Sequence, residues 1–141
     1  MVKLDRKAKT AIVEAIRFAE KETSGQIRVH IKPLCKKDVM EEAKKIFFKL
    51  KMHRTKEKNA VLVFIALKDR HFAILGDEGI HVRVRDDFWN STRDLMASFF
   101  AKGRLTEGIV AGVIEIGERL KEFFPVKPKN SNELSDTVTE G

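Results

Sequence analysis

Apolar side chains recur along much of the chain with the period of about 3.6 residues that is typical of helices with one buried face. Four segments show this stripe, and helices are predicted over residues 7–22, 38–50, 86–102 and 105–124. In the last of these, Gly108 and Gly112 stand one turn apart. We expect them to let another part of the backbone pack closely.

Polar residues and glycines mark the ends of these helices. Asp38, with Glu41 three residues later, resembles a capping box at the start of the second helix. Asp86 and Asp87 stand at the predicted start of the third, where the helix dipole favours negative charge. Gly103 ends that helix, because glycine tolerates the left-handed conformation found at helix ends.

Three other segments have the patterns of strands. Residues 26–31 alternate between apolar and polar, which predicts a strand with unequal faces. Residues 60–67 are apolar without a break, as in a central strand covered on both sides. The polar residues 68–70 are few enough for a hairpin, so residues 71–75 are expected to return antiparallel.

The predicted order is α-β-α-β-β-α-α. A right-handed crossover through the second helix makes the first two strands parallel, and the hairpin adds an antiparallel one. The fold class is therefore α/β, a three-layer α/β/α sandwich on a small mixed β-sheet. Residues 1–125 are expected to form one domain, and residues 126–141, polar and without a period, a disordered C-terminal tail.

Composition narrows the class of protein. The chain has 141 residues, 28 basic against 21 acidic, and 43% apolar residues, as expected for a soluble globular domain with a net charge of +7. Its single cysteine, Cys35, excludes an internal disulfide and a cysteine zinc site. With no membrane-length apolar run and no secretory signal, we expect a cytoplasmic protein, and we favour a monomer.

The topology gathers acidic residues at one end of the sheet. The first strand starts, the second starts and the third ends there, together with their flanking loops. Asp77 and Glu78 lie in one of these loops, and Asp86 and Asp87 follow it. Carboxylates of this kind suit a hard cation, Ca²⁺ or Mg²⁺. The competing interpretation is that these residues cap helices or pair with neighbouring arginines.

The chain also resembles a known family in several short motifs. These are residues 20–29 (EKETSGQIRV), 59–64 (NAVLVF), the pair Asp69-Arg70, and residues 76–80 (GDEGI). In sequence and order they resemble the TPM domain, over about residues 7–124. The likeness is strongest to stand-alone bacterial members without a signal, in which this loop leads to an Asp-Phe-Trp segment like residues 87–89.

The resemblance implies an α/β/α sandwich and, in some members, divalent cations held by acidic residues at the loop end. By position, the ligands implied here are Asp77 and Asp87, with Glu78 and Asp86 beside them. A phosphatase activity has been attributed to plant members, and other relatives act through partner proteins. Two positions depart from the family pattern and weaken the metal and phosphatase inferences. Gln26 stands where many relatives carry Glu, and Arg104 where many carry Asp.

The leading functional hypothesis is a non-catalytic module that binds a divalent cation, with no catalytic residue assigned. The first alternative is a metal-dependent phosphatase acting on small phosphoesters. The second is a scaffold that binds a protein partner through a basic face, for which residues 49–58 are the basic run. Nucleic acid is not an expected partner, because contact with bases usually requires exposed aromatic rings. Phe47, in the helix before the basic run, belongs to the apolar stripe that faces the core.

Overall fold

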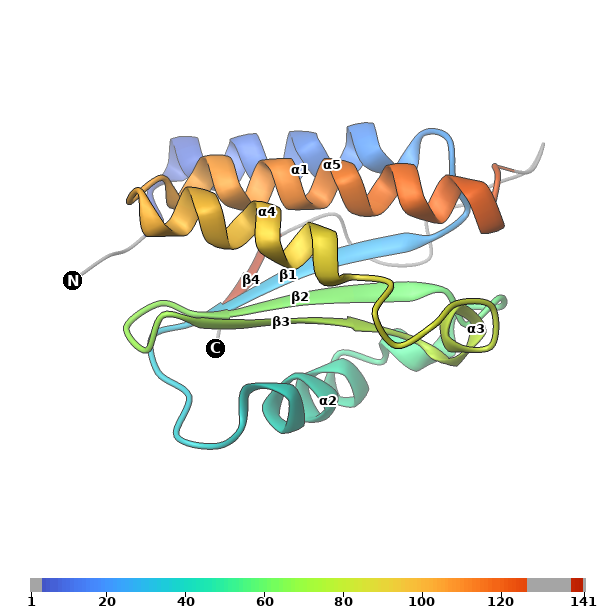
Figure 1. Ribbon diagram of the computed structural model, residues 1–141, viewed down its shortest axis with the longest axis horizontal. Helices are drawn as coiled ribbons and strands as arrows, with labels where there is room; N and C mark the ends of the chain where they lie inside the picture. The colour runs from blue at the N-terminus through green and yellow to red at the C-terminus, as the bar shows by residue number, and fades with distance from the viewer. Residues whose placement is uncertain (1–3, 127–137, 141) are drawn as a thin grey trace.

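The computed structural model describes residues 4–126 and 138–140, and it shows a mixed sheet with helices on both faces (Figure 1). The strands are β1 (Gln26–Lys32), β2 (Ala60–Ala66), β3 (His71–Gly76) and β4 (Val138–Glu140). The helices are α1 (Arg6–Glu20), α2 (Val39–Lys49), the 3-10 turn η1 (Met52–Arg54), α3 (Glu78–His81), α4 (Asn90–Ala101) and α5 (Leu105–Phe123). The predicted α/β class and element order are confirmed, with α3, η1 and β4 added.

The strand order is β3-β2-β1-β4. β1 runs parallel to β2, with Gln26 opposite Ala60, and β3 returns antiparallel, with Gly76 opposite Val61. The strand pairing and the hairpin therefore agree with the prediction. This register brings the starts of β1 and β2 and the end of β3 to the same end of the sheet.

β2 explains how one apolar strand serves two cores. Its side chains alternate between faces, and every residue of the strand is buried. Val61, Val63 and Ile65 belong to the core under α1, α4 and α5. Leu62 and Phe64 belong to the smaller core under α2. The unbroken apolar run is thus required by helices on both sides of the sheet.

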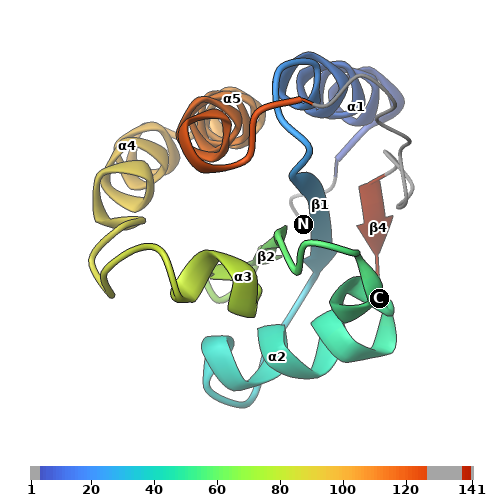
Figure 2. The same cartoon turned by 90° about the vertical axis from the view of Figure 1, so that its right-hand side faces the viewer.

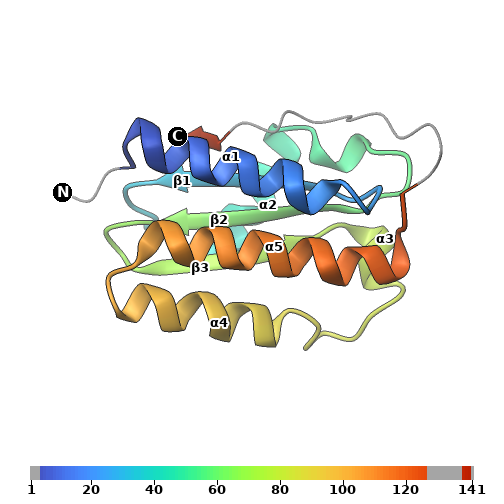
Figure 3. The same ribbon diagram turned by 90° about the horizontal axis from the view of Figure 1, so that it is seen from above.

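The larger helical layer is held together by close approach at glycine. α5 lies between α1 and α4 over one face of the sheet (Figure 3). A β-carbon on Gly108 would stand 2.5 Å from the Phe100 ring, and one on Gly112 would stand 2.3 Å from the Met96 sulfur. Both contacts join α5 to α4, so the expected close packing at these two glycines is confirmed.

The segment between β3 and α4 departs from the sequence-based expectation. The four-residue helix α3 occupies part of what was expected to be a loop, and Asp77 caps it. α4 begins at Asn90, after the turns that hold Asp86 and Asp87, and its N-cap is Trp89. The two aspartates therefore precede the helix and do not occupy its first turn. Trp89 is 7% exposed, and its burial against the core fixes where α4 begins.

Part of the expected disordered tail forms a strand. Val138–Glu140 make β4, which pairs in parallel with Val29–Ile31 of β1. Thr139 donates a hydrogen bond to the Val29 carbonyl at 3.2 Å, and Glu140 forms a 2.7 Å ion pair with Lys9 of α1. Val126, the first residue of the predicted tail, donates its main-chain N–H to the Glu22 carbonyl at 3.3 Å, and residues 127–137 and 141 lie outside the described residues. The prediction therefore fails at the three residues of β4.

Within the residues that the structure describes, no helix has the length and apolar character needed to cross a membrane.

Candidate functional site

The loop end of the sheet is where the predicted cation site would lie. Figure 2 looks at this end, with α3 beside the start of β2. Three chain segments meet here: residues 23–25 before β1, residues 55–59 before β2, and residues 77–80 after β3. The main-chain N–H of Asp77 donates to the Ala60 carbonyl at 2.9 Å, which extends the pairing of β2 and β3 to the edge of the site. The convergence expected from the topology is confirmed.

A polar network joins the first two segments. Ser24 Oγ donates to Glu57 Oε2 at 3.0 Å, and Asn59 Nδ2 lies 3.1 Å from Ser24 Oγ and 3.4 Å from Glu57 Oε2. Asn59 is 1% exposed, and its buried amide holds the loop before β1 against the loop before β2. The network leaves a carboxylate, a hydroxyl and an amide side by side at the start of β1 and β2.

Glu57 is the residue of this site that the sequence did not single out. It stands inside the basic run 49–58, and its contact with Ser24 spans 33 positions of the chain. The signal that could have found it is its place just before a buried strand, in one of the three segments that the topology brings together. The parallel pairing of β1 and β2 brings such a position beside the loop that precedes β1.

Asp77 carries one of the two buried side-chain oxygens of the site that have no hydrogen-bond partner among the described residues; the other is Oγ1 of Thr55. Asp77 Oδ1 accepts a hydrogen bond from the main-chain N–H of Glu78 at 2.7 Å and so caps α3. Its Oδ2 is buried and has no hydrogen-bond partner among the described residues. A buried carboxylate oxygen without a partner is costly, because it has lost its hydration without replacement.

Gly79 clamps the loop of Glu57 against α3. Its N–H donates to the Lys58 carbonyl at 2.8 Å, and a β-carbon on this glycine would stand 2.1 Å from the Glu57 carbonyl oxygen. Because that neighbour is backbone, it cannot move aside as a side chain could. Only glycine permits the approach, which brings the segments carrying Glu57 and Asp77 into direct contact.

The other two predicted ligands lie in different surroundings. Asp86 and Asp87 are exposed and belong to the turns between α3 and α4. Asp87 lines a surface hollow of about 450 Å³ together with Arg83, Arg85 and Arg119. Guanidinium groups beside a carboxylate compete with any cation for it.

The four predicted ligands therefore divide into two pairs. Asp77 and Glu78 stand at the start of α3, and Asp86 and Asp87 lie on the segment that follows it. Among the described residues, no set of three or more His, Cys, Asp or Glu side chains is arranged to hold a metal ion. A cation at this end would have to draw on hydroxyl, amide or main-chain oxygens as well, and the ligand assignment stays a prediction.

The two departures from the family pattern lie at opposite ends of the sheet. Gln26 is 1% exposed at the loop end, where its amide donates to the Ser24 carbonyl at 3.4 Å. Arg104 precedes α5 at the other end, where it pairs with Glu107 and lies over the Phe99 ring. That ion pair raises the pKa of Arg104 and lowers that of Glu107. Arg104 therefore has no part in the loop-end site.

His30 and Cys35 are both engaged in structural contacts. His30 is 7% exposed and its Nδ1 lies 2.6 Å from Thr139 Oγ1. Burial is the main cause that lowers its pKa, helped by nearby Lys32, Lys49 and Arg28. The Cys35 thiol donates to the Lys37 carbonyl at 3.2 Å.

The basic run, residues 49–58, is anchored by Met52, which is fully buried. The phosphatase and basic-scaffold alternatives stay predictions.

Known proteins resemble this chain in sequence and in fold. The model of one protein family, described as the TPM domain, matches residues 3–119. The solution structure of the BA42 protein from the psychrophilic bacterium Bizionia argentinensis is 41% identical, with a TM-score of 0.93 over 99% of this chain and 97% of that one.

A more distant likeness shows the fold alone. The N-terminal domain of the cg2496 protein from Corynebacterium glutamicum has a TM-score of 0.67 at 12% identity, over 99% of this chain and 82% of that one. A search of curated proteins found no match.

Proposed function

This chain belongs to the TPM domain family, and from that premise we propose that it binds one divalent cation, Ca²⁺ or Mg²⁺, at the loop end of the sheet. The observation that carries the proposal is the buried Oδ2 of Asp77, which has no hydrogen-bond partner among the described residues. A cation would replace the hydration that this oxygen has lost. The other oxygen of the carboxylate is already held by the cap of α3, so the ligand is fixed in orientation.

The ligand set that fits this position comes from both clamped segments. Asp77 would bind directly, with Glu57 or Glu78 as a second carboxylate, and hydroxyl, amide or main-chain oxygens of the same loops would complete the set. Ca²⁺ and Mg²⁺ both accept carboxylate, hydroxyl and carbonyl oxygens, and both retain water where the protein supplies few ligands. We assign Asp86 and Asp87 no direct contact, because Arg83 and Arg85 share their segment. Two carboxylates with water favour binding of modest strength.

A titration of ¹⁵N-labelled protein with CaCl₂ and, separately, MgCl₂ tests the proposal at each backbone amide. We expect saturable shifts confined to residues 24–26, 57–59 and 77–80. The Asp77→Asn variant keeps the cap but removes the charge, so it should lose the saturable response. Asp87→Asn, which removes one exposed carboxylate nearby, is the matched control and should respond like the unmodified chain.

Two results would contradict this site. Shifts centred on residues 83–91, and lost in the Asp87→Asn variant, would move the cation to the second pair of carboxylates. Shifts that grow linearly to millimolar metal without saturation would show only screening of surface charge. Either outcome would remove Asp77 as a ligand.

A further inference from the structure

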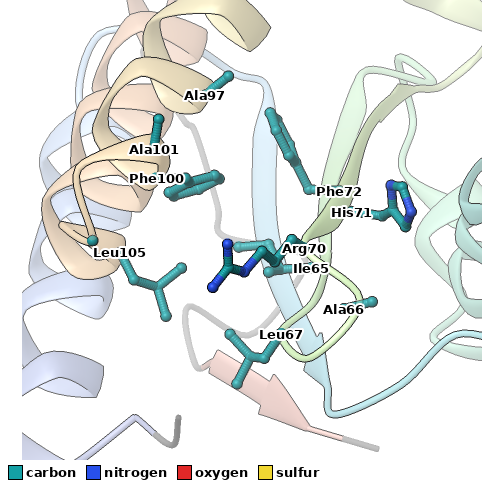
Figure 4. A pocket seen from close by; sticks show the side chains of 11 residues that line it. Ile65, Ala66, Leu67, Arg70, His71, Phe72, Ala97, Phe100, Ala101 and Leu105 are labelled. Atoms are coloured by element: carbon teal, nitrogen blue, oxygen red, sulfur yellow. The ribbon is translucent and has the colours of Figure 1, made fainter.

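A cavity lies at the opposite end of the sheet from the proposed cation site. It has a volume of about 490 Å³ and opens between the β2–β3 hairpin and the turn that joins α4 to α5 (Figure 4). Cavities of this size are typical of sites for small molecules. Nothing in the proposed cation function involves this end of the molecule.

The walls of the cavity are apolar and partly aromatic. Ile65 comes from the end of β2, Leu67 from the hairpin turn that follows it, and Leu105 from the start of α5. The rings of Phe72 and Phe100 meet edge to face with centroids 5.1 Å apart, so β3 and α4 together form an aromatic wall. Such a wall favours the flat face or edge of another ring.

Small residues keep the cavity open. α4 presents Ala97 and Ala101 to it, and Gly103 follows at φ +74°, in the left-handed region that ends the helix. Nothing lies within 4 Å of the place where a β-carbon on Gly103 would stand. The turn between α4 and α5 thus leaves free space beside the aromatic wall.

One cationic side chain reaches into this apolar space. Arg70 lies in the hairpin turn, and its guanidinium points toward Leu105 and Phe100 (Figure 4). Among the described residues, the guanidinium of Arg70 has no hydrogen bond and no ion pair. Its acidic neighbour Asp69 accepts a hydrogen bond from the Cys35 N–H at 2.6 Å and is engaged there. No Asp or Glu is among the described residues that line the cavity.

We propose that this cavity binds a small aromatic carboxylate, with the ring against Phe72 and Phe100 and the carboxylate on Arg70. A guanidinium forms two parallel hydrogen bonds with one carboxylate, which matches a singly charged ligand. A dianionic phosphate needs more donors than this single arginine supplies. The net charge of +7 adds a general attraction for anions but does not by itself select this site.

The test is a titration of ¹⁵N-labelled protein with naphthoate and, in parallel, with its neutral analogue naphthamide. We expect naphthoate to cause saturable shifts at residues 65–72 and 97–105, and naphthamide to bind about tenfold more weakly or worse, because it lacks the charge-assisted pair. Arg70→Gln should weaken naphthoate binding by about tenfold. The control Lys68→Gln, which removes an exposed charge two positions earlier in the same turn, should change it by less than about twofold. Ala101→Leu should block both ligands by filling the space.

Three results would overturn the proposal. Equal affinity for naphthoate and naphthamide in the unmodified chain would remove the role of the guanidinium without relying on any variant. Unchanged naphthoate binding in Arg70→Gln would do the same. Shifts that do not saturate, or that fall at residues 24–26 and 77–80, would show that the cavity is not a carboxylate site. Because the two ends are probed by different amides, failure here leaves the cation proposal intact.

Discussion

Gly112 of α5 lies so close to Met96 of α4 that a β-carbon on the glycine would stand 2.3 Å from the methionine sulfur. Met96 is fully buried, and its Cγ would also be only 2.5 Å away, so the side chain has little room to turn aside. The contact fixes the distance between the two helices.

We therefore expect Gly112→Ala to lower the free energy of unfolding by about 1 kcal/mol, and by no more than about 2 kcal/mol. Overpacking of a core lowers the free energy of unfolding by about 1–3 kcal/mol. The better helix propensity of alanine offsets about 1 kcal/mol of this at most. Urea denaturation measures the difference. In a Met96→Ala background the same substitution should cost nothing, since the obstructing side chain is gone. An equal cost in both backgrounds would mean that this contact is not the cause.

Thr23 joins the end of α5 to the start of β1. Its Oγ1 donates to the Phe124 carbonyl at 2.6 Å and accepts from the Gly25 N–H at 3.0 Å, and the residue is fully buried. Thr23→Val keeps the shape but leaves the Gly25 N–H without this partner, and the Phe124 carbonyl keeps only its bond from the Ser24 N–H at 2.9 Å. We expect a loss of about 1–3 kcal/mol in urea denaturation.

Thr10→Val is the matched control for that change. The Thr10 hydroxyl donates to the Arg6 carbonyl on the exposed side of α1, where water can replace it. We expect its effect to stay within about 0.5 kcal/mol, as for most surface substitutions. If the two valine variants lose the same stability, the buried hydrogen bonds of Thr23 are not what holds α5 to β1.

His30 should make stability depend on pH. Burial lowers its pKa below the ordinary value of 6.5, with Lys32, Lys49 and Arg28 adding to the effect and Glu42 opposing it. Below that value the unfolded chain binds a proton that the folded chain does not yet accept. Its contribution to stability is therefore complete above the ordinary pKa and is lost as the pH falls toward the folded pKa.

Urea midpoints measured from neutral to mildly acidic pH test this dependence. The His30→Gln variant should show a shallower loss of stability across that range than the unmodified chain. His71→Gln removes one exposed imidazole and serves as the control. A slope for His30→Gln that matches the unmodified chain would contradict the assignment.

Asp77 has a structural role that can be separated from cation binding. Asp77→Ala removes the cap of α3, which should cost about 0.5–2 kcal/mol, whereas Asp77→Asn keeps an oxygen for the Glu78 N–H and should cost less. Thermal unfolding without metal ranks the two variants. With saturating Ca²⁺, only the unmodified chain should gain stability, because binding to the folded state alone raises it. A gain in Asp77→Asn of the same size would place the cation elsewhere.

The elements that the sequence predicts well are those with a long apolar period. The stripes of α1, α2 and α5, the cap at Asp38 and the buried run of β2 each carry a local signal, and each agrees with the structure. The cap is the bond from the Glu41 N–H to Asp38 at 3.2 Å. Because the topology follows from these elements, the meeting of the three loops also follows.

The features that the sequence does not predict depend on distant contacts. α3 has four residues, and β4 has three, which is too short for a period to show. The start of α4 is set by burial of Trp89 in the core and not by the charges before it. Glu57 gains its place through Ser24, and Arg70 gains its apolar surroundings from α4 and α5. No local pattern could show either relationship.

β4 has a consequence for how this protein meets other copies of itself. Without Val138–Glu140, the segment Val29–Ile31 of β1 would be an outer strand with unpaired main-chain groups and largely apolar side chains. Strands exposed in this way add to one another and promote aggregation. β4 pairs with these main-chain groups of β1, so another strand cannot add there. The Lys9–Glu140 ion pair helps to hold β4 in place. The chain's own C-terminal segment therefore shields this part of the sheet edge from a second copy.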